Sequence, residues 1–166
     1  FGVVFVPTPT TSAGFASLEE TALGRTVPLS ARQKIIGQKM LWSKRNIPCF
    51  YLHLDADVTG LVQLRKDLNK TADVPVSYND FLIYALTRAL KKFPVMTGSL
   101  QGQNIILPEN INIALAVELP DGVAAPVLKN LEGKRLSQIA REKTRLVEKT
   151  EAGKLRFEDL EGACIT

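Results

Sequence analysis

Three side chains with catalytic potential lie close together in the sequence: Cys49, His53 and Asp55. His53 is the only histidine in the chain. Residues 49–57 alternate apolar and polar side chains, a pattern that predicts a half-buried strand with His53 and Asp55 on one face. There the carboxylate could orient the imidazole as a general base. The alternative, which we favour, is a partly exposed histidine on a strand or in a contact between subunits.

Cys49 and Cys164 are the only cysteines. A cysteine nucleophile needs a base beside it, and the sequence places no histidine or basic group clearly next to Cys49. We therefore expect Cys49 to be a small buried residue. The two cysteines are far apart and form no Cys-x-x-Cys pair, so we expect neither a disulfide scaffold nor a protein metal site.

The composition narrows the functional classes. The chain has 166 residues, 45% of them apolar and 23% charged, as in an ordinary globular domain. No apolar run approaches the ~20 residues that span a bilayer, so we expect no membrane association. The net charge of +4 is small, and the basic residues are scattered with few aromatics between them, which argues against nucleic acid. This mild positive charge suits an anionic ligand such as a phosphorylated cofactor.

Two regions differ in composition. Residues 1–25 include a run rich in Pro, Thr, Ser and Gly, which predicts a linker or flexible N-terminal arm. Residues 26–166 have the periodicity of a folded domain. Helices are predicted over residues 31–44, 59–68, 77–92 and 137–151, and strands over 49–57, 104–107, 111–119 and 123–128, with a further strand beginning at the end of the chain. This order predicts an α+β fold, a two-layer sandwich with a mixed sheet.

Local signals mark two of the helix starts. Ser30 is expected to cap the helix over residues 31–44, and Ser77 with Asp80 is close to a capping box for the helix that follows them.

Four stretches, in order and at matching spacing, resemble the acyltransferase core of 2-oxo acid dehydrogenase complexes. They are residues 27–36 leading to Ile47-Pro48, residues 64–69, residues 76–81 running to Phe93-Pro94, and residues 112–117 followed by Asp121-Gly122 and Glu158-Asp159-Leu160. The resemblance covers residues 26–166, as the N-terminal part of such a core domain. It implies a fold similar to that of chloramphenicol acetyltransferase, incomplete at the C-terminus.

The resemblance also implies a function. Members of this family move an acyl group from S-acyl dihydrolipoamide to the thiol of coenzyme A and form the structural core of the complex. Coenzyme A is a substrate and the lipoyl group, carried on a separate domain, is the acyl donor. Implied partners are other copies in a homotrimer that assembles into a cage, lipoyl domains, and the decarboxylase and dihydrolipoamide dehydrogenase components. Such complexes occur in the bacterial cytoplasm or the mitochondrial matrix.

The resemblance assigns candidate site residues as well. The family has a basic pair near the phosphates of coenzyme A, and the matching residues are Arg65 and Lys66; the alternative is an ordinary solvated helix face. The family's general base is the histidine of a His-x-x-x-Asp-Gly motif, which would lie beyond Thr166. We therefore expect no catalytic residue in these 166 residues, no such role for His53, and no activity from this chain alone.

Two other interpretations stay open. A non-catalytic scaffold or core-binding paralogue would keep the same fold without the catalytic end, and an interaction domain could use the fold for an unrelated purpose. The acyl group also stays open: acetyl is the commonest, with succinyl and branched-chain acyl groups as alternatives. Cage symmetry is not readable from the sequence.

Overall fold

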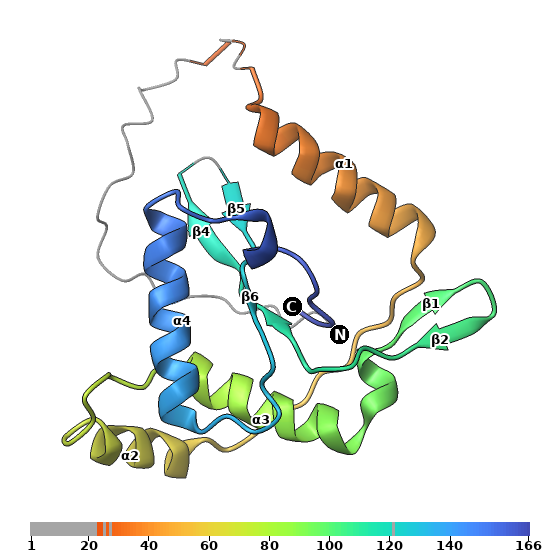
Figure 1. Cartoon of the computed structure of the whole chain (residues 1–166). Helices are drawn as coiled ribbons and strands as arrows, with labels where there is room; N and C mark the ends of the chain where they lie inside the picture. Colours follow the sequence, from red (N-terminus) through yellow and green to blue (C-terminus); the bar gives the residue numbers. More distant parts are fainter. Residues whose placement is uncertain (1–22, 25, 27, 121) are drawn as a thin grey trace. The chain divides into compact units, whose positions relative to one another are not determined.

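The computed structural model describes residues 23, 24, 26, 28–120 and 122–166 of the chain. Its helices and short strands make the α+β fold predicted from the sequence (Figure 1). The chain divides into two compact units, one with the residues up to His53 and Glu118–Val123, the other with Leu54–Val117 and Ala124–Thr166. The predicted N-terminal arm lies outside the described residues, apart from 23 and 24.

The first unit contains α1, Ala31–Asn46, which begins where the sequence predicted and runs two residues further. The Ser30 hydroxyl accepts a hydrogen bond from the Gln33 N–H at 3.1 Å, and the Gln33 side chain accepts one from the Ser30 N–H at 2.9 Å. These bonds satisfy N–H groups that a helix start otherwise leaves unpaired. The predicted cap is therefore confirmed.

A glycine lets the turn between two strands approach α1. Strand β4, Val117–Leu119, pairs with β5, Gly122–Ala124. Gly122 has a φ of 143°, and a Cβ at this position would lie 3.1 Å from Ile36 Cδ1 and 3.2 Å from Arg32 Cδ. Any other residue would be strained there and would press on the helix. The hairpin predicted from the alternation is thus present, and Gly122 lies against α1 within the first unit.

The strand predicted over residues 49–57 is wrong, since none of these residues is in a strand. Phe50, Leu52 and Leu54, expected on one buried face, are 71%, 69% and 93% exposed. A strand persists only when a neighbour pairs with its backbone N–H and C=O groups. No strand among the described residues pairs with this segment. The alternation is therefore present in the sequence without the pairing that would make it a strand.

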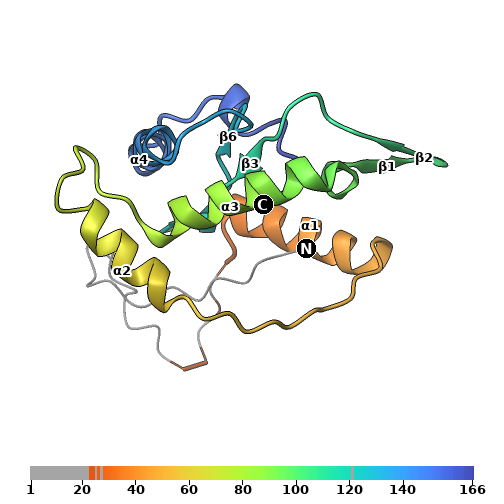
Figure 2. The same ribbon diagram turned by 90° about the horizontal axis from the view of Figure 1, so that it is seen from below.

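The second unit begins with two helices, α2, Thr59–Leu68, and α3, Tyr78–Lys92, both close to their predicted bounds. Figure 2 shows how the chain passes from α2 into α3. Leu61 of α2 packs against a small cluster that includes Val76 and Phe81. This contact holds the short helix α2 against the start of α3, because a helix of this length is marginal by itself.

The main core of the second unit lies between α3, the helix α4, Leu136–Glu151, and a short ladder of strands β3, Ile113–Ala114, and β6, Val127–Leu128. These strands pair antiparallel, with Ile113 opposite Leu128. The predicted strand 111–119 is thus present as the two short strands β3 and β4. The buried cluster consists of Ile83, Leu90, Ile111, Ile113, Leu128, Leu131 and Ile139. Helix α4 ends as predicted at Gly153, whose φ is 65°.

A second hairpin carries an exposed apolar face. The strand predicted at 104–107 is β2, Asn104–Ile106, which pairs with β1, Ser99–Gln101, after the short helix η1, Pro94–Thr97. Leu100 lies opposite Ile105, so both point to one face. Both side chains are more than half exposed. Figures 1 and 2 show this hairpin extending away from the helices of its unit.

The last described residues run beside β3. The Ala114 N–H donates to the Ile165 carbonyl at 2.8 Å, and Ile113 and Ile165 form a parallel bridge. Because β6 is antiparallel to β3, the segments on the two sides of β3 run in opposite directions. The predicted mixed pairing is thus present at this point, whereas the strand expected at the end of the chain is represented by this one bridge.

A buried carboxylate joins α3 to α4. Asp80 is fully buried, and its Oδ2 accepts hydrogen bonds from the Ser77 N–H and hydroxyl, each at 2.7 Å, and from Lys143 Nζ at 2.9 Å. Lys143 is only 14% exposed and also contacts the Ser77 hydroxyl at 2.5 Å. The other oxygen, Oδ1, has no partner among the described residues. One carboxylate thus caps α3 and neutralises a lysine from α4.

Another carboxylate ties the end of α4 to the short helix η2, Phe157–Asp159. Lys149 Nζ donates to Asp159 Oδ2 at 2.5 Å, and the Arg156 N–H donates to the same oxygen at 2.7 Å. The hydrogen bond from Lys149, and then that from Arg156, hold the pKa of Asp159 below its usual range. The contact closes the loop that follows Gly153.

Replacing Lys143 by Met should lower the free energy of unfolding by about 3–5 kcal/mol, because Asp80 would keep a buried charge without its cation. The double variant Lys143→Met/Asp80→Asn should lose less than the single one, which urea denaturation can measure. Lys91→Met, at an exposed position of α3, serves as control. A loss below about 1 kcal/mol for Lys143→Met would show that the buried pair is not essential.

Removing the Asp159 charge should change how stability depends on pH. Since the folded pKa lies below the unfolded one, this carboxylate stabilises fully above the unfolded value of about 4, and the contribution is lost as the pH falls through the folded pKa. Asp159→Asn should therefore be less stable at neutral pH and show a flatter decline in acid. Lys149→Met should flatten the same decline. Unchanged slopes in denaturation between about pH 3 and 7 would contradict the assignment.

Candidate functional site

The two residues of the predicted basic pair differ in burial and in their contacts. Arg65, on α2, is half-buried; its Nε donates to the Val76 carbonyl at 3.0 Å, and its guanidinium lies 4.6 Å from the centre of the Tyr78 ring. Lys66 is exposed, and its ammonium has no hydrogen bond or ion pair among the described residues. Arg65 therefore stabilises the contact between α2 and the start of α3, whereas the ammonium of Lys66 is accessible to solvent or a ligand.

Asp67, the neighbour of Lys66, forms its ion pair with another lysine. Lys70 Nζ lies 2.7 Å from one Asp67 oxygen, and the Gln63 side chain donates to the other at 3.0 Å. The hydrogen bond from Lys70, followed by that from Gln63, lowers the pKa of Asp67. The aspartate is thus ionised and already paired with another lysine. An uncompensated cation on a helix surface can attract an anionic ligand.

A cavity of about 450 Å³ opens beside Arg65. It is lined by Leu68, Thr71, Ala72, Asp73, Val74, Val76, Arg135, Leu136, Ser137 and Arg141. Its lining combines apolar side chains with Arg135 and Arg141, and Arg141 is in a 3.0 Å ion pair with Asp73. Val76, whose carbonyl binds Arg65, belongs to this lining. The cavity is large enough for part of an organic ligand and has two arginines in its lining.

The histidine predicted as an alternative base has no site around it. His53 is exposed, and its ring has no hydrogen bond or ion pair among the described residues. The shared face with Asp55 depended on the predicted strand, which is not formed. The structure therefore gives no support to a base formed by these two side chains.

Cys49 is exposed, so the prediction of a small buried residue is wrong. A basic group also lies near it, which the sequence did not reveal. Lys44 Nζ donates to the Tyr51 hydroxyl at 2.7 Å, and Cys49 Sγ lies 3.8 Å from the same oxygen. The hydrogen bond to Tyr51, and then the electrostatic interaction with Cys49, raise the pKa of Lys44. The chain turns after α1, and this turn brings Tyr51 back to the helix.

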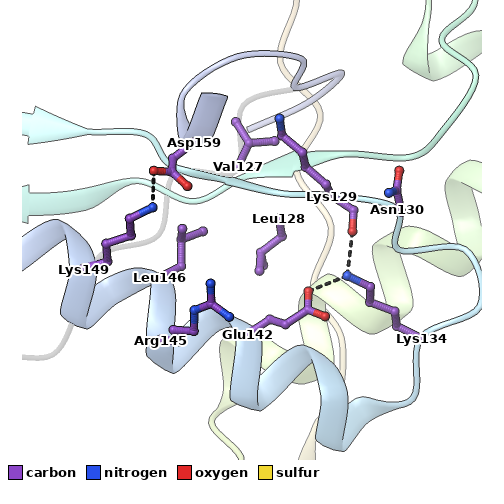
Figure 3. Close-up of a pocket in the computed structure, with 10 residues that line it drawn as sticks. All are labelled: Val127, Leu128, Lys129, Asn130, Lys134, Glu142, Arg145, Leu146, Lys149 and Asp159. Atoms are coloured by element: carbon purple, nitrogen blue, oxygen red, sulfur yellow. Dashed lines mark hydrogen bonds and ion pairs between the residues drawn. The ribbon is translucent and has the colours of Figure 1, made fainter. Parts of the chain in front are cut away.

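A second cavity, of about 290 Å³, lies between β6 and α4 (Figure 3). Its lining consists of Val127, Leu128, Lys129, Asn130, Lys134, Glu142, Arg145, Leu146, Lys149 and Asp159. At one end Lys149 pairs with Asp159, and at the other Lys134 pairs with Glu142 (Figure 3). The basic residues of this cavity carried no signal in the sequence, because they come from separate segments.

Two further features are absent from the part of the chain that the structure describes. No group of three His, Cys, Asp or Glu side chains in it is arranged to hold a metal ion. None of its helices combines the length and apolarity needed to cross a membrane.

Comparison with known proteins gives consistent relatives. The acetyltransferase component of the pyruvate dehydrogenase complex from Rickettsia felis is 33% identical over 146 residues, and the mitochondrial one from Saccharomyces cerevisiae is 36% identical over 153. These matches cover 86% and 90% of this chain. The chain spans about a third of the length of these relatives, 35% and 32% respectively.

Solved structures resemble the chain over most of its length. A probable dihydrolipoamide acetyltransferase from Listeria monocytogenes has a TM-score of 0.80 at 35% identity, covering 86% of this chain and 63% of that one. The dihydrolipoamide acetyltransferase of Azotobacter vinelandii has a TM-score of 0.82 at 30% identity, covering 96% of this chain and 66% of that one.

The family model for the catalytic domain of the 2-oxoacid dehydrogenase acyltransferases matches residues 22–166. This match includes both helices and strands of the second unit and the α1 region of the first. Together with an α+β fold like those of solved acetyltransferase cores, it establishes that the chain belongs to the 2-oxoacid dehydrogenase acyltransferase (catalytic domain) family.

Proposed function

We propose that this chain acts in the acyltransferase core of a 2-oxo acid dehydrogenase complex and moves an acyl group, acetyl in the first place, from S-acyl dihydrolipoamide to coenzyme A. The observation that carries the proposal is the family match over residues 22–166. Several relatives are acetyltransferase components of pyruvate dehydrogenase complexes, and one from Bacillus subtilis serves a branched-chain complex. Acetyl is therefore the first donor to test, with branched-chain acyl groups next.

Coenzyme A, in this proposal, meets the basic pair on α2. Lys66 supplies an unpaired charge for a phosphate, because Asp67 is already bound to Lys70. Arg65 acts mainly by holding α2 to the start of α3 through Val76. The adjacent cavity of about 450 Å³ offers apolar surface and further arginines for the rest of the ligand. The lipoyl group is brought by a separate domain as a substrate arm, and no metal takes part.

The proposal extends to assembly. A solved structure titled as the cubic core of the pyruvate dehydrogenase multienzyme complex resembles the chain with a TM-score of 0.80 at 31% identity. We propose homotrimers that build a larger cage, which lipoyl domains, the decarboxylase and dihydrolipoamide dehydrogenase approach. Relatives from bacteria and from mitochondria are in keeping with the bacterial cytoplasm or the mitochondrial matrix as the compartment.

The protein that contains this chain, at its natural length, should form acetyl coenzyme A from S-acetyl dihydrolipoamide and coenzyme A. The rate should saturate with both substrates, and succinyl and isobutyryl donors compared in parallel should reveal the preferred acyl group. Product formation is followed by liquid chromatography. A folded protein that yields no acyl coenzyme A from any donor, yet still joins the complex, would instead be a non-catalytic scaffold.

Lys66→Ala should raise the Michaelis constant for coenzyme A about three- to tenfold at unchanged turnover, because an exposed cation contributes a modest charge-assisted contact. Arg65→Ala should raise it too, and should also lower the free energy of unfolding by about 1–2 kcal/mol, since it loses the bond to Val76 and the packing on Tyr78. Lys91→Ala, an exposed lysine on α3, is the matched control. Equal Michaelis constants for Lys66→Ala and Lys91→Ala would remove Lys66 from the site.

A further inference from the structure

Arg145 differs from Lys134 and Lys149, the two cations of the cavity between β6 and α4 that ion pairs hold. Lys134 Nζ is bound by the Lys129 carbonyl at 2.7 Å and by Glu142, and Lys149 Nζ is bound by Asp159. The guanidinium of Arg145 has no hydrogen bond or ion pair among the described residues. Both carboxylates of the cavity are therefore in ion pairs with lysines, and the guanidinium of Arg145 has no carboxylate partner.

The guanidinium of Arg145 lies between two ammonium groups, those of Lys134 and Lys149, that are held by ion pairs. Figure 3 shows Arg145 on α4 between the Lys149–Asp159 pair and the Lys134–Glu142 pair, whereas the Lys129 ammonium points away from α4. Each bound lysine has N–H bonds that its partners do not use, and the guanidinium has all of its own. Three cationic side chains, two of them held by ion pairs, therefore line one small cavity.

This pattern matches a tetrahedral oxyanion. Guanidinium forks bind phosphate through paired N–H bonds, and ammonium groups on either side can serve the remaining oxygens. Pockets for drug-sized ligands measure about 300–1,000 Å³, so a cavity of about 290 Å³ suits a single group rather than a whole cofactor. We propose that this cavity is an anion site that takes a phosphate group, with Arg145 as its anchor.

This site is separate from the basic pair on α2 and does not rest on the acyltransferase function. The phosphate could be free inorganic phosphate or the phosphomonoester of a nucleotide such as coenzyme A, because both present the same oxygens. The affinities for inorganic phosphate, 3′-phosphoadenosine and adenosine distinguish free phosphate from a nucleotide phosphomonoester.

Calorimetric titration of the protein with inorganic phosphate, at constant ionic strength, should show saturable binding. Arg145→Gln should weaken the binding tenfold or more, because the bidentate contact is lost. Arg45→Gln, at an exposed position in the last turn of α1 and outside both cavities, should leave it unchanged. Tighter, Arg145-dependent binding of 3′-phosphoadenosine would assign the site to a phosphomonoester, and equal binding would assign it to free phosphate.

The inference is overturned if the parent protein binds no phosphate, or if Arg145→Gln binds phosphate as tightly as the parent protein does. Arg145 is exposed, so its replacement should not disturb folding. Arg145→Lys provides a second variant that keeps the charge but not the fork, and it should bind with intermediate strength. Loss of acyl transfer alone would not bear on this site, because the readout is phosphate binding.

Discussion

The buried carboxylate of Asp80 holds the second unit together. A charge that is fully buried must be paired, and the pairing cation, Lys143, lies 63 residues further along the chain. The same oxygen also caps α3 through Ser77. Helix α4 is thereby held in one register against α3, and the apolar side chains between them are brought into contact. The positions of the other elements of the unit depend on that register.

Helix periodicity then distributes the remaining side chains of α4. Ile139 is buried in the core, and Lys143, one turn further on, meets Asp80. Glu142, Arg145 and Lys149 recur at spacings of three and four, so they line a neighbouring stripe that faces β6 (Figure 3). The ion pairs at the ends of the cavity and the free guanidinium between them are consequences of how α4 is anchored.

The basic pair on α2 illustrates the same rule. Consecutive residues of a helix point roughly 100° apart, so Arg65 can turn toward Val76 and Tyr78 while Lys66 faces outward. In the sequence the two residues look like one binding feature. In the structure Arg65 stabilises the fold, and Lys66 remains available to a ligand. The same division explains why the proposed roles of the two residues differ in their expected effect on stability.

The helices followed from the sequence alone, and so did the caps of α1 and α3, because Ser30 with Gln33 and Ser77 with Asp80 act over three residues. The family was also identified from the sequence, through four stretches in matching order and spacing over most of the chain. Tertiary structure decided the rest. The alternating segment 49–57 forms no strand, since a strand depends on a partner supplied from elsewhere in the chain. The cavity beside Arg145 likewise exists only because distant segments meet, and neither their contact nor the charge left unpaired between them is encoded by spacing.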